Sequence, residues 1–510
     1  MAYTRVKNYL NGEWVEEKGV EYMPLYNPST GEEIGEVPFS SNQSALLAID
    51  SAHEAYRSWR KTPLGKRVDI LIGIRQAMIE KEEELAFSIA IDQAKHISEA
   101  RGEVRRVIEI LEAACALPSL MQGDYMERIA ASINARVVRQ PLGVFGGVAP
   151  FNFPALVFGW FVPYAIGAGN AFIYKPSSLS PLFMQKMGEI LSQLDLPGGV
   201  VNIIHGEKEI PESWYDQSKI SGVCLVGSSG TAKKIAEACG RGGKRSMLLG
   251  GAKNYLLVME DVNWDVFIDN FVHSCFGSAG QRCLAGSVVA AVPEVYDELI
   301  ERTLEAAKKV KVGDALDPDV YMGPVISKEA KARIENYVEI GVEQGSKLLL
   351  DGRNPPVPEK NKNGYFVGPT IFADVTPCRR IAQEEIFGPL VSIMKVSDLQ
   401  DGLDIIERQR FGNGACIFTQ NQYYAETFIT EANVGMVGVN VGVCAPHPYM
   451  PFGGIKDSLI GTNKVQGNEG LDFFTQNKIA TVRTIAPQEN SASGDQKIAT
   501  SDVVRSCVAN

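Results

Sequence analysis

The spacing of apolar and polar positions changes along the first part of the chain. Before residue 40, turn signals interrupt short apolar runs, and Asn11-Gly12 is the dipeptide typical of a tight hairpin. Residues 42–120 carry apolar side chains at helical spacing, beginning with Ala45 and Ile49. The pattern therefore predicts a β-rich start followed by helices.

Short apolar runs then alternate with helical segments. Four runs within residues 142–250 are typical of strands: 143–149, 171–174, 199–204 and 222–226. This β-α-β rhythm predicts a parallel sheet. It restarts after Gly251, with a strand expected at 288–292 and helices at 294–312 and 327–345. Two α/β units that divide at Gly250-Gly251 are the simplest interpretation.

Three segments have patterns of their own. Residues 153–174 are almost wholly apolar, but prolines and glycines interrupt them, which favours a buried helix leading into a short strand over a membrane span. Apolar residues alternate from Arg128 to Val138, which predicts a half-buried strand or ribbon. Residues 486–510 are polar and predict a disordered tail. The N-terminus has no apolar signal region.

Composition narrows the function classes. The 510 residues carry a net charge of −11 and no long basic run, which argues against a nucleic-acid partner. The nine cysteines are scattered and form no C-x-x-C pair, so neither a zinc site nor a disulfide framework is indicated, and a reducing cytosol fits best. The five histidines lack metal-ligand spacing, so no metal is expected.

Cys283 is the candidate nucleophile. It lies in the small-residue segment Phe276–Gly286, where a substrate can approach closely and backbone N–H groups can reach the sulfur. The alternative for any free cysteine is a small buried hydrophobe. The glycine fingerprint of dinucleotide-binding folds is absent, because the segment 167–172 lacks the last glycine, so a dinucleotide must be held in another way.

Several separated motifs resemble those of the aldehyde dehydrogenases, over roughly residues 5–485. In chain order they are Pro150-Phe151-Asn152-Phe153-Pro154, Lys175-Pro176-Ser177, Gly227-Ser228-Ser229, Leu249-Gly250-Gly251, Gly280-Gln281-Arg282-Cys283, Glu385-Ile386-Phe387-Gly388-Pro389 and Pro451-Phe452-Gly453-Gly454. The resemblance implies an α/β fold with a Rossmann-like cofactor domain, an α/β catalytic domain and a small β oligomerisation ribbon, assembled as a homodimer or homotetramer. The boundaries expected are 1–127 with 142–250 for the cofactor domain, 251–465 for the catalytic domain, and 128–141 with 466–485 for the ribbon.

The resemblance also assigns roles. Cys283 attacks an aldehyde, and the Asn152 side chain with the Cys283 backbone N–H stabilises the oxyanion. The cofactor contacts implied are Lys175 and Ser178 near the adenosine ribose, Gly227 and Ser228 near the diphosphate, and Glu385 and Phe387 near the nicotinamide ribose. Members specific for NAD commonly have glutamate at the Ser178 position, where a carboxylate repels a 2′-phosphate. NAD is expected, with NADP as the alternative.

A second departure concerns release of the product. Hydrolytic members place a general-base glutamate two residues before the Gly-Gly pair, where this chain has Leu248. The thiol of coenzyme A needs no such base. The missing glutamate and the run Gly-Gly-Ala252-Lys253-Asn254 resemble the CoA-acylating methylmalonate-semialdehyde dehydrogenases. That subfamily implies Arg106 and Arg282 as the pair that binds the substrate carboxylate.

The sequence therefore predicts NAD-dependent oxidation of a short anionic semialdehyde, of the malonate or methylmalonate type, with acyl transfer to coenzyme A and no membrane partner. One alternative is an NAD(P)-dependent enzyme that uses water to release a free acid from an anionic aldehyde such as a sulfo-aldehyde, because two arginines suit either anion. A more remote alternative is a catalytically silent structural or binding member, which the intact Cys283, Asn152 and Glu385 disfavour.

Overall fold

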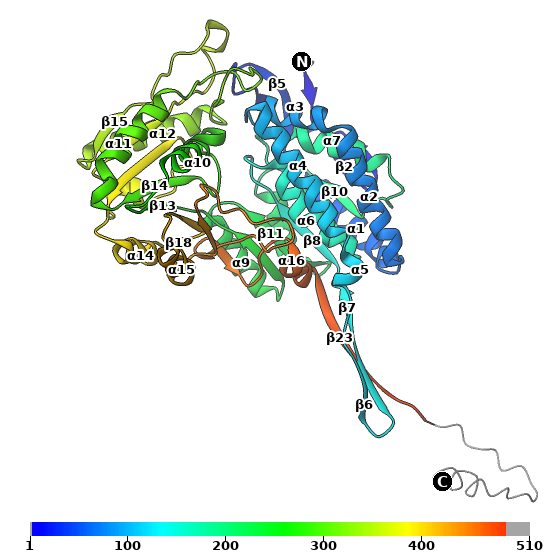
Figure 1. Ribbon diagram of the computed structural model, residues 1–510. Coiled ribbons are helices and arrows are strands. Elements are labelled where there is room, and N and C mark those ends of the chain that lie inside the picture. Colours follow the sequence, from blue (N-terminus) through cyan, green and yellow to red (C-terminus); the bar gives the residue numbers. More distant parts are fainter. Residues whose placement is uncertain (1–2, 486–510) are drawn as a thin grey trace, which may run out of the picture. The chain divides into compact units, whose positions relative to one another are not determined.

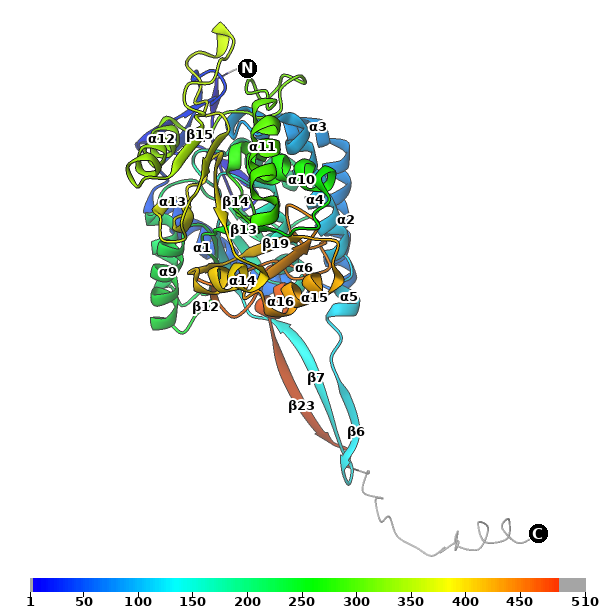
Figure 2. The ribbon, with the colours of Figure 1, turned by 60° about the vertical axis from the view of Figure 1, so that its left-hand side comes forward.

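The computed structural model describes residues 3–485, so the expected tail at 486–510 lies outside the described residues. The chain divides into a large unit of residues 3–122 and 139–476 and a small unit of residues 123–138 and 477–485. The large unit contains two extended sheets with their helices (Figures 1 and 2). No helix in the described range is long and apolar enough to cross a membrane.

The first sheet has eight strands in the order β22-β12-β11-β8-β9-β10-β2-β3, and its central strands are parallel. Its central strands are largely buried, as expected when helices cover both faces of a parallel sheet. Its strands are β22 (Leu459–Gly461), β12 (Arg245–Leu249), β11 (Ile220–Val226), β8 (Val144–Val148), β9 (Ala171–Lys175), β10 (Val201–Ile203), β2 (Asn8–Leu10) and β3 (Glu13–Val15).

Helices cover the two faces of this sheet and bury a separate apolar cluster on each. One face packs against α1 (Asn42–Trp59), α8 (Glu209–Tyr215) and α9 (Ser229–Arg241). The other face packs against α6 (Pro154–Ala168), behind which lie α2 (Leu64–Glu80), α4 (Ile97–Ala114), α7 (Leu182–Ser192) and α16 (Gly467–Phe474). Successive side chains along a strand point to opposite faces of the sheet, so neighbouring residues of one strand face different clusters.

The second sheet has seven strands in the order β15-β16-β17-β14-β13-β19-β20 and its own apolar core. Its strands are β15 (Lys347–Leu350), β16 (Thr370–Ala373), β17 (Leu390–Lys395), β14 (Gly286–Ala291), β13 (Asn254–Val258), β19 (Gly414–Phe418) and β20 (Met436–Val439). Its helices are α10 (Trp264–Phe276), α11 (Pro293–Lys308), α12 (Lys328–Glu343), α13 (Arg380–Gln383), α14 (Leu399–Arg408) and α15 (Gln422–Glu431).

The remaining elements are short. They are β1 (Thr4–Arg5), β4 (Tyr22–Tyr26) and β5 (Glu33–Pro38) in one small sheet, β18 (Phe411–Gly412) paired with β21 (Ile455–Lys456), α3 (Glu82–Asp92), α5 (Leu117–Leu120), and the 3-10 turns η1 (Gly277–Gly280) and η2 (Glu359–Asn361). The hairpin predicted at Asn11-Gly12 joins β2 to β3 and is confirmed.

The predicted buried helix is also confirmed. The apolar stretch forms α6, ends at Gly169 with φ of 102°, and continues into β9. A left-handed residue directly after a helix is the usual position for glycine, because it has no Cβ to clash.

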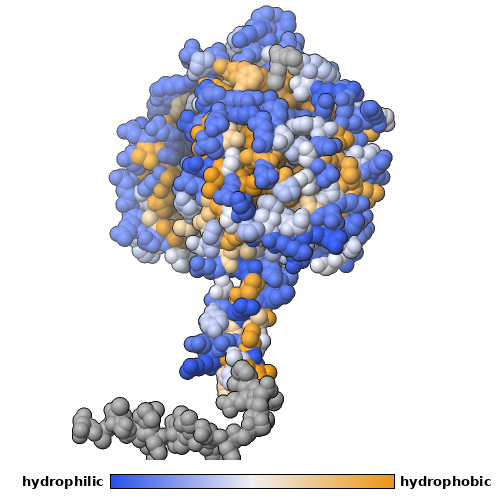
Figure 3. Space-filling model, turned by 90° about the vertical axis from the view of Figure 1, so that its right-hand side faces the viewer, coloured by the Kyte–Doolittle hydropathy of each residue, from blue (hydrophilic) through white to orange (hydrophobic). Residues whose placement is uncertain are grey.

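Of the two alternatives predicted at 128–138, a half-buried strand or a ribbon, the structure shows the ribbon. A turn at Ala131-Ser132 divides it into β6 (Tyr125–Ala130) and β7 (Ile133–Pro141), and Ser132 has a positive φ of 60°. These strands form a three-stranded sheet in the order β23-β7-β6, where β23 is Thr475–Arg483. Every residue of β6 is exposed, so the alternation does not mark a buried face; apolar atoms show on the ribbon surface in Figure 3.

Candidate active site

The candidate site lies where the eight-stranded sheet reverses its strand order. The chain runs outward from β8 to β10 and then returns to β11 on the other side of β8. Loops that follow parallel strands at such a point form a crevice. Here the loops after β8 and β11 line a cavity of about 330 Å³. Six of the expected site residues lie in its wall: Asn152, Gly227, Ser228, Cys283, Glu385 and Phe387.

Cys283 lies between this cavity and a second one of about 240 Å³. Phe153 and Trp160 also line both cavities. The Cys283 carbonyl oxygen accepts hydrogen bonds from the side-chain amides of Asn254, at 3.0 Å, and Asn413, at 2.8 Å. The backbone of the candidate nucleophile is thus fixed where the two cavities meet its side chain.

The turn before Cys283 is strained and is held from another helix. Ser278 and Ala279 have positive φ values of 51° and 52°, a conformation that costs non-glycine residues about 1–3 kcal/mol each. The backbone N–H of Ser278 donates to both carboxylate oxygens of Glu99, on α4, at 3.1 and 3.0 Å. Glu99 therefore helps to set the path of the chain toward Cys283.

Asn152 is buried beside Cys283. Its Nδ2 donates one hydrogen bond to the Gln281 carbonyl oxygen at 2.9 Å. A side-chain amide carries two hydrogens, so one remains for an oxygen in the cavity. This geometry suits the oxyanion role implied by the resemblance.

The Cys283 thiol is protonated at neutral pH in this state. Burial, followed by the nearby Glu385 carboxylate, raises its pKa to about 12, while its own backbone N–H and Arg282 act in the opposite direction. The thiolate is the nucleophilic form, so the site must lower this pKa before the reaction begins.

We expect Glu385→Gln to lower the pKa of Cys283, because it removes the carboxylate charge that disfavours the thiolate. A lower pKa leaves more thiolate at any pH below it, so alkylation by iodoacetamide without cofactor should be roughly 3- to 10-fold faster at about pH 8. Peptide mass spectrometry across the pH range would locate the midpoint. Glu384→Gln is the matched control, since Glu384 pairs with Arg380 instead; an unchanged profile in Glu385→Gln would contradict the assigned cause.

Glu385 is half-buried against the loop that follows β12. Its Oε1 accepts from the Ala252 backbone N–H at 2.8 Å, and desolvation raises its pKa. Burial lowers the pKa of nearby Lys253 to about 7, and its Nζ has no hydrogen-bond partner within residues 3–485. The Phe387 ring packs edge-on against Phe151, with 5.8 Å between ring centres. Glu385, Phe387 and Phe151 line the first cavity together with Asn152.

Lys175 is the last residue of β9 and Ser178 follows in the next loop, and both lie outside the lining of that cavity. Lys175 is buried and its Nζ donates to the Pro176 carbonyl oxygen at 3.2 Å. The Ser178 hydroxyl donates to Oε1 of Glu207, after the neighbouring strand β10, at 2.9 Å. A carboxylate therefore reaches the Ser178 position from the adjacent loop, although the sequence has none at that position.

Arg106 and Arg282 both line the second cavity with Cys283. Arg282 forms an ion pair with Glu99, and its Nη1 donates to the His273 carbonyl oxygen at 3.2 Å. Arg106 pairs with Glu109, one turn further along α4, at 2.9 Å. The structure thus brings the two expected anion ligands to one cavity that the nucleophile also lines.

Leu248 and Leu249 are the last two residues of β12 and point to opposite faces of the sheet. Leu248, the position at which the resemblance implies a missing glutamate, belongs to the cluster under α1, α8 and α9, whereas Leu249 belongs to the cluster against which Cys283 packs. Neither leucine lines either of the two cavities, and neither can activate water.

Four residues at or beside the site were missed by the sequence analysis: Lys95, Glu99, Glu103 and Glu207. Lys95, Glu99 and Glu103 line the second cavity, and two of them are four residues apart on α4. Acidic residues at this spacing share one helix face, and here that face is otherwise largely buried. The spacing of Glu99 and Glu103 could therefore have pointed to this cavity. No sequence pattern pointed to Glu207, because its contact with Ser178 arises only when the sheet places β9 beside β10.

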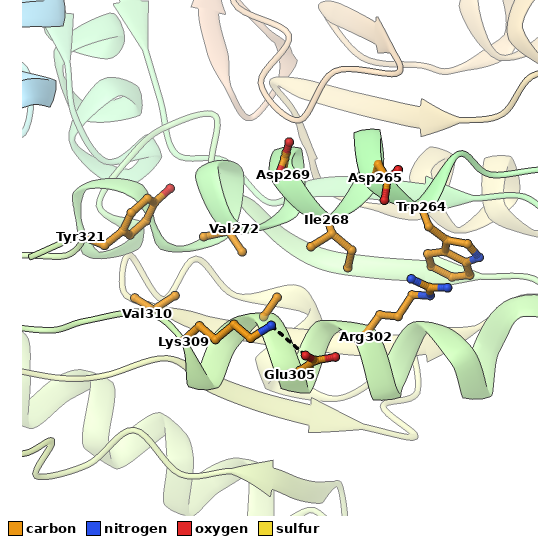
Figure 4. A pocket seen from close by; sticks show the side chains of 11 residues that line it. Trp264, Asp265, Ile268, Asp269, Val272, Arg302, Glu305, Lys309, Val310 and Tyr321 are labelled. Atoms are coloured by element: carbon orange, nitrogen blue, oxygen red, sulfur yellow. Dashed lines mark hydrogen bonds and ion pairs between the residues drawn. The ribbon is translucent and has the colours of Figure 1, made fainter.

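A larger groove of about 600 Å³ lies between α10 and α11, away from the predicted residues. Trp264 lies under the Arg302 guanidinium, and Lys309 pairs with Glu305 at 2.7 Å (Figure 4). No group of three or more potential ligand side chains within residues 3–485 is arranged to hold a metal ion.

Comparison with known proteins places this geometry in context. The model of the aldehyde dehydrogenase family matches residues 14–480. A malonate-semialdehyde dehydrogenase of Oceanobacillus iheyensis is 41% identical over 480 residues, which cover 94% of this chain and 98% of that protein. The solved structure of a methylmalonate-semialdehyde dehydrogenase from Oceanimonas doudoroffii matches with a TM-score of 0.93 at 35% identity, over 95% of this chain and 99% of the other. A structure from Sinorhizobium meliloti 1021, described as a methylmalonate-semialdehyde dehydrogenase complexed with NAD, matches with a TM-score of 0.94 at 32% identity, over 96% and 100% of the two chains.

These matches confirm the fold class predicted from the sequence and the resemblance that carried the site residues. They cover both extended sheets as well as the motifs themselves.

Proposed function

The chain belongs to the aldehyde dehydrogenase family, and we propose that it oxidises a short semialdehyde bearing a carboxylate, of the malonate or methylmalonate type, with NAD as oxidant and coenzyme A as acyl acceptor. The observation that carries this proposal is the second cavity, where Arg106 and Arg282 lie in the same wall as Cys283. The names of the relatives support a carboxylate over a sulfonate as the anion.

The chemistry follows from the residues around Cys283. As the thiolate, its Sγ attacks the aldehyde carbon, while Asn152 Nδ2 and the Cys283 backbone N–H donate to the oxygen as it gains charge. Gly227, Ser228, Glu385 and Phe387 would hold NAD in the first cavity, where it would supply the hydride acceptor for that carbon. The acyl group then remains on Cys283 as a thioester. Because Cys283 lines both cavities, substrate and oxidant reach it from different sides.

Arg106 and Arg282 would hold the far carboxylate. A guanidinium presents parallel N–H donors that match a carboxylate. Arg282 forms an ion pair with Glu99 in this structure, so a bound carboxylate would share the Arg282 guanidinium with Glu99 or replace that contact. Arg282 directly precedes Cys283 in the chain, which favours a small substrate.

Release of the acyl group is assigned to coenzyme A. Neither Leu248 nor Leu249, the two residues before Gly250, offers a proton acceptor for water. A thiolate attacks a thioester without such a base. Loss of carbon dioxide from a malonate-type product would then give acetyl- or propionyl-CoA.

Formation of NADH from malonate semialdehyde, with and without coenzyme A, tests this proposal. We expect sustained turnover only when coenzyme A is present, with acyl-CoA identified by mass. Equal turnover to a free acid without coenzyme A would instead support the hydrolytic alternative. Activity with sulfonated aldehydes alone would show that the substrate anion is a sulfonate. No activity with any aldehyde would support the catalytically silent alternative.

We infer that NAD is preferred over NADP because Glu207 supplies the carboxylate that Ser178 lacks. A carboxylate accepts ribose hydroxyls and repels a 2′-phosphate. Glu207→Gln should therefore weaken NAD binding and strengthen NADP binding, which would lower the ratio of the two affinities by roughly 10-fold or more. Titration of intrinsic tryptophan fluorescence with each dinucleotide measures this without turnover.

Glu209→Gln is the matched control, since it removes an exposed carboxylate two residues away at the start of α8. It should leave the affinity ratio unchanged. Equal ratios in both variants would show that Glu207 does not select the cofactor.

Assembly as a homodimer or homotetramer is proposed from the ribbon. Tyr125, Met126 and Ile479 expose more than 60% of their surface there. Apolar side chains grouped on a small sheet are typical of surfaces that associate. A reducing cytosol, which keeps thiols free, suits a Cys283-dependent enzyme.

A further inference from the structure

A buried ion pair lies beside the oxyanion donor. Lys95 Nζ donates to Oε2 of Glu103 at 2.5 Å, and only 1% of either side chain is exposed. Both residues line the second cavity, yet the proposed chemistry uses neither. Two charges removed from water carry a large desolvation cost, so their presence needs a reason.

Lys95 contacts the loop that carries the oxyanion donor. Besides Glu103, its Nζ donates to the backbone carbonyl oxygen of Asn152 at 2.7 Å. It also lies 3.9 Å from the centre of the Phe153 ring, within range of a cation–π interaction. The ammonium therefore binds the two successive residues that face the reacting atoms.

Glu103 holds two residues of the same chain segment that follow Pro154. Its Oε1 accepts from the backbone N–H groups of Ala155, at 2.8 Å, and Leu156, at 3.0 Å. These groups belong to the first turn of α6, where backbone donors lack helical partners, and the N-cap residue Phe153 provides no side-chain cap. A carboxylate from α4 thus caps α6 from outside the helix.

We propose that Lys95 and Glu103 are positioning residues that fix Asn152 and Phe153 for oxyanion stabilisation. The inference rests on the proposed role of Asn152. The pair ties the segment from Asn152 to Leu156 to α4, the helix that also presents Arg106 and, through Glu99, holds Arg282. The same helix, α4, therefore positions both the oxyanion donor and the residues of the substrate anion site.

Two apolar side chains in place of Lys95 and Glu103 would fill this space, but they could not hold the segment from Asn152 to Leu156. It offers no acceptor for the α6 N–H groups and no donor for the Asn152 carbonyl oxygen. Preorganised donors act only when they are held where charge develops. A small shift of the loop would therefore reduce the rate of the chemical step more than it would reduce binding.

A double-mutant cycle between Glu103→Gln and Asn152→Ala tests this inference. Glu103→Gln should lower kcat for NADH formation by roughly 10- to 100-fold, with little change in the dissociation constant for NAD. Asn152→Ala should lower kcat by roughly 100- to 1000-fold. If Glu103 acts through Asn152, the double variant should be close to Asn152→Ala alone.

The outcomes separate the inference from the function on which it rests. Independent, multiplicative losses would overturn the positioning role while leaving Asn152 as the oxyanion donor. Full activity of Asn152→Ala would overturn the proposed oxyanion role itself. Should Glu103→Gln fail to fold, Lys95→Arg enters the same cycle, and it retains the positive charge while changing the geometry.

Glu83→Gln serves as the matched control. It breaks the exposed ion pair that Glu83 forms with Arg101, on the same helix α4. Because that pair contacts neither cavity, kcat should be unchanged. A loss equal to that of Glu103→Gln would show that any charge change near α4 has this effect, and would overturn the inference.

Discussion

Cys283→Ala is expected to abolish NADH formation from any aldehyde, by roughly 10⁴-fold or more, because no other side chain can form the thioester. Among the described cysteines it is Cys283 that lies in the walls of both cavities. The variant should still bind NAD, since the loops after β8 and β11 are untouched. Initial rates and a dinucleotide titration on the same sample separate chemistry from binding.

Cys378→Ala is the control for this variant. Cys378 is exposed and lies outside both cavities, so its loss should not change the rate. Residual aldehyde-dependent NADH formation in Cys283→Ala, at more than about a hundredth of the parent rate, would point to another nucleophile or to direct hydride transfer from a hydrated aldehyde.

The sequence was informative where local pattern and tertiary structure agree. The apolar stretch around Pro163 predicts a buried helix correctly, because its composition suits a core and Gly169 can end the helix. The alternation at 128–138 was less specific, because it allowed either a half-buried strand or a ribbon. Those residues cross a turn and form a ribbon whose strand β6 is exposed, so the period alone did not identify a buried face.

The site shows the same division. Motifs located Cys283, Asn152 and Glu385, since the chemistry of each depends on its own side chain. Lys95 and Glu103 act through contacts between α4 and a loop some 50 residues later, and no local pattern reports such a pairing.

The second large effect concerns release of the acyl group. Leu249 belongs to the cluster against which Cys283 packs, so Leu249→Glu should introduce a general base on that face of β12 and allow water to release the acyl group. General-base catalysis contributes typically about 10²- to 10⁴-fold, so NADH turnover without coenzyme A should rise by roughly 10-fold or more even with imperfect geometry. The product would be a free acid instead of acyl-CoA. Rates measured with and without coenzyme A, together with product mass, check this.

Leu248→Glu is the matched comparison, because it makes the same chemical change one residue earlier. There the carboxylate would be buried in the apolar cluster under α1, α8 and α9, at a cost of about 3–5 kcal/mol in folding free energy. We expect a lower melting temperature and no hydrolytic turnover. Leu249→Gln should also lack hydrolysis, because an amide is not a base. Hydrolysis by Leu248→Glu alone would instead show that a general base acts from the position that the family resemblance implies.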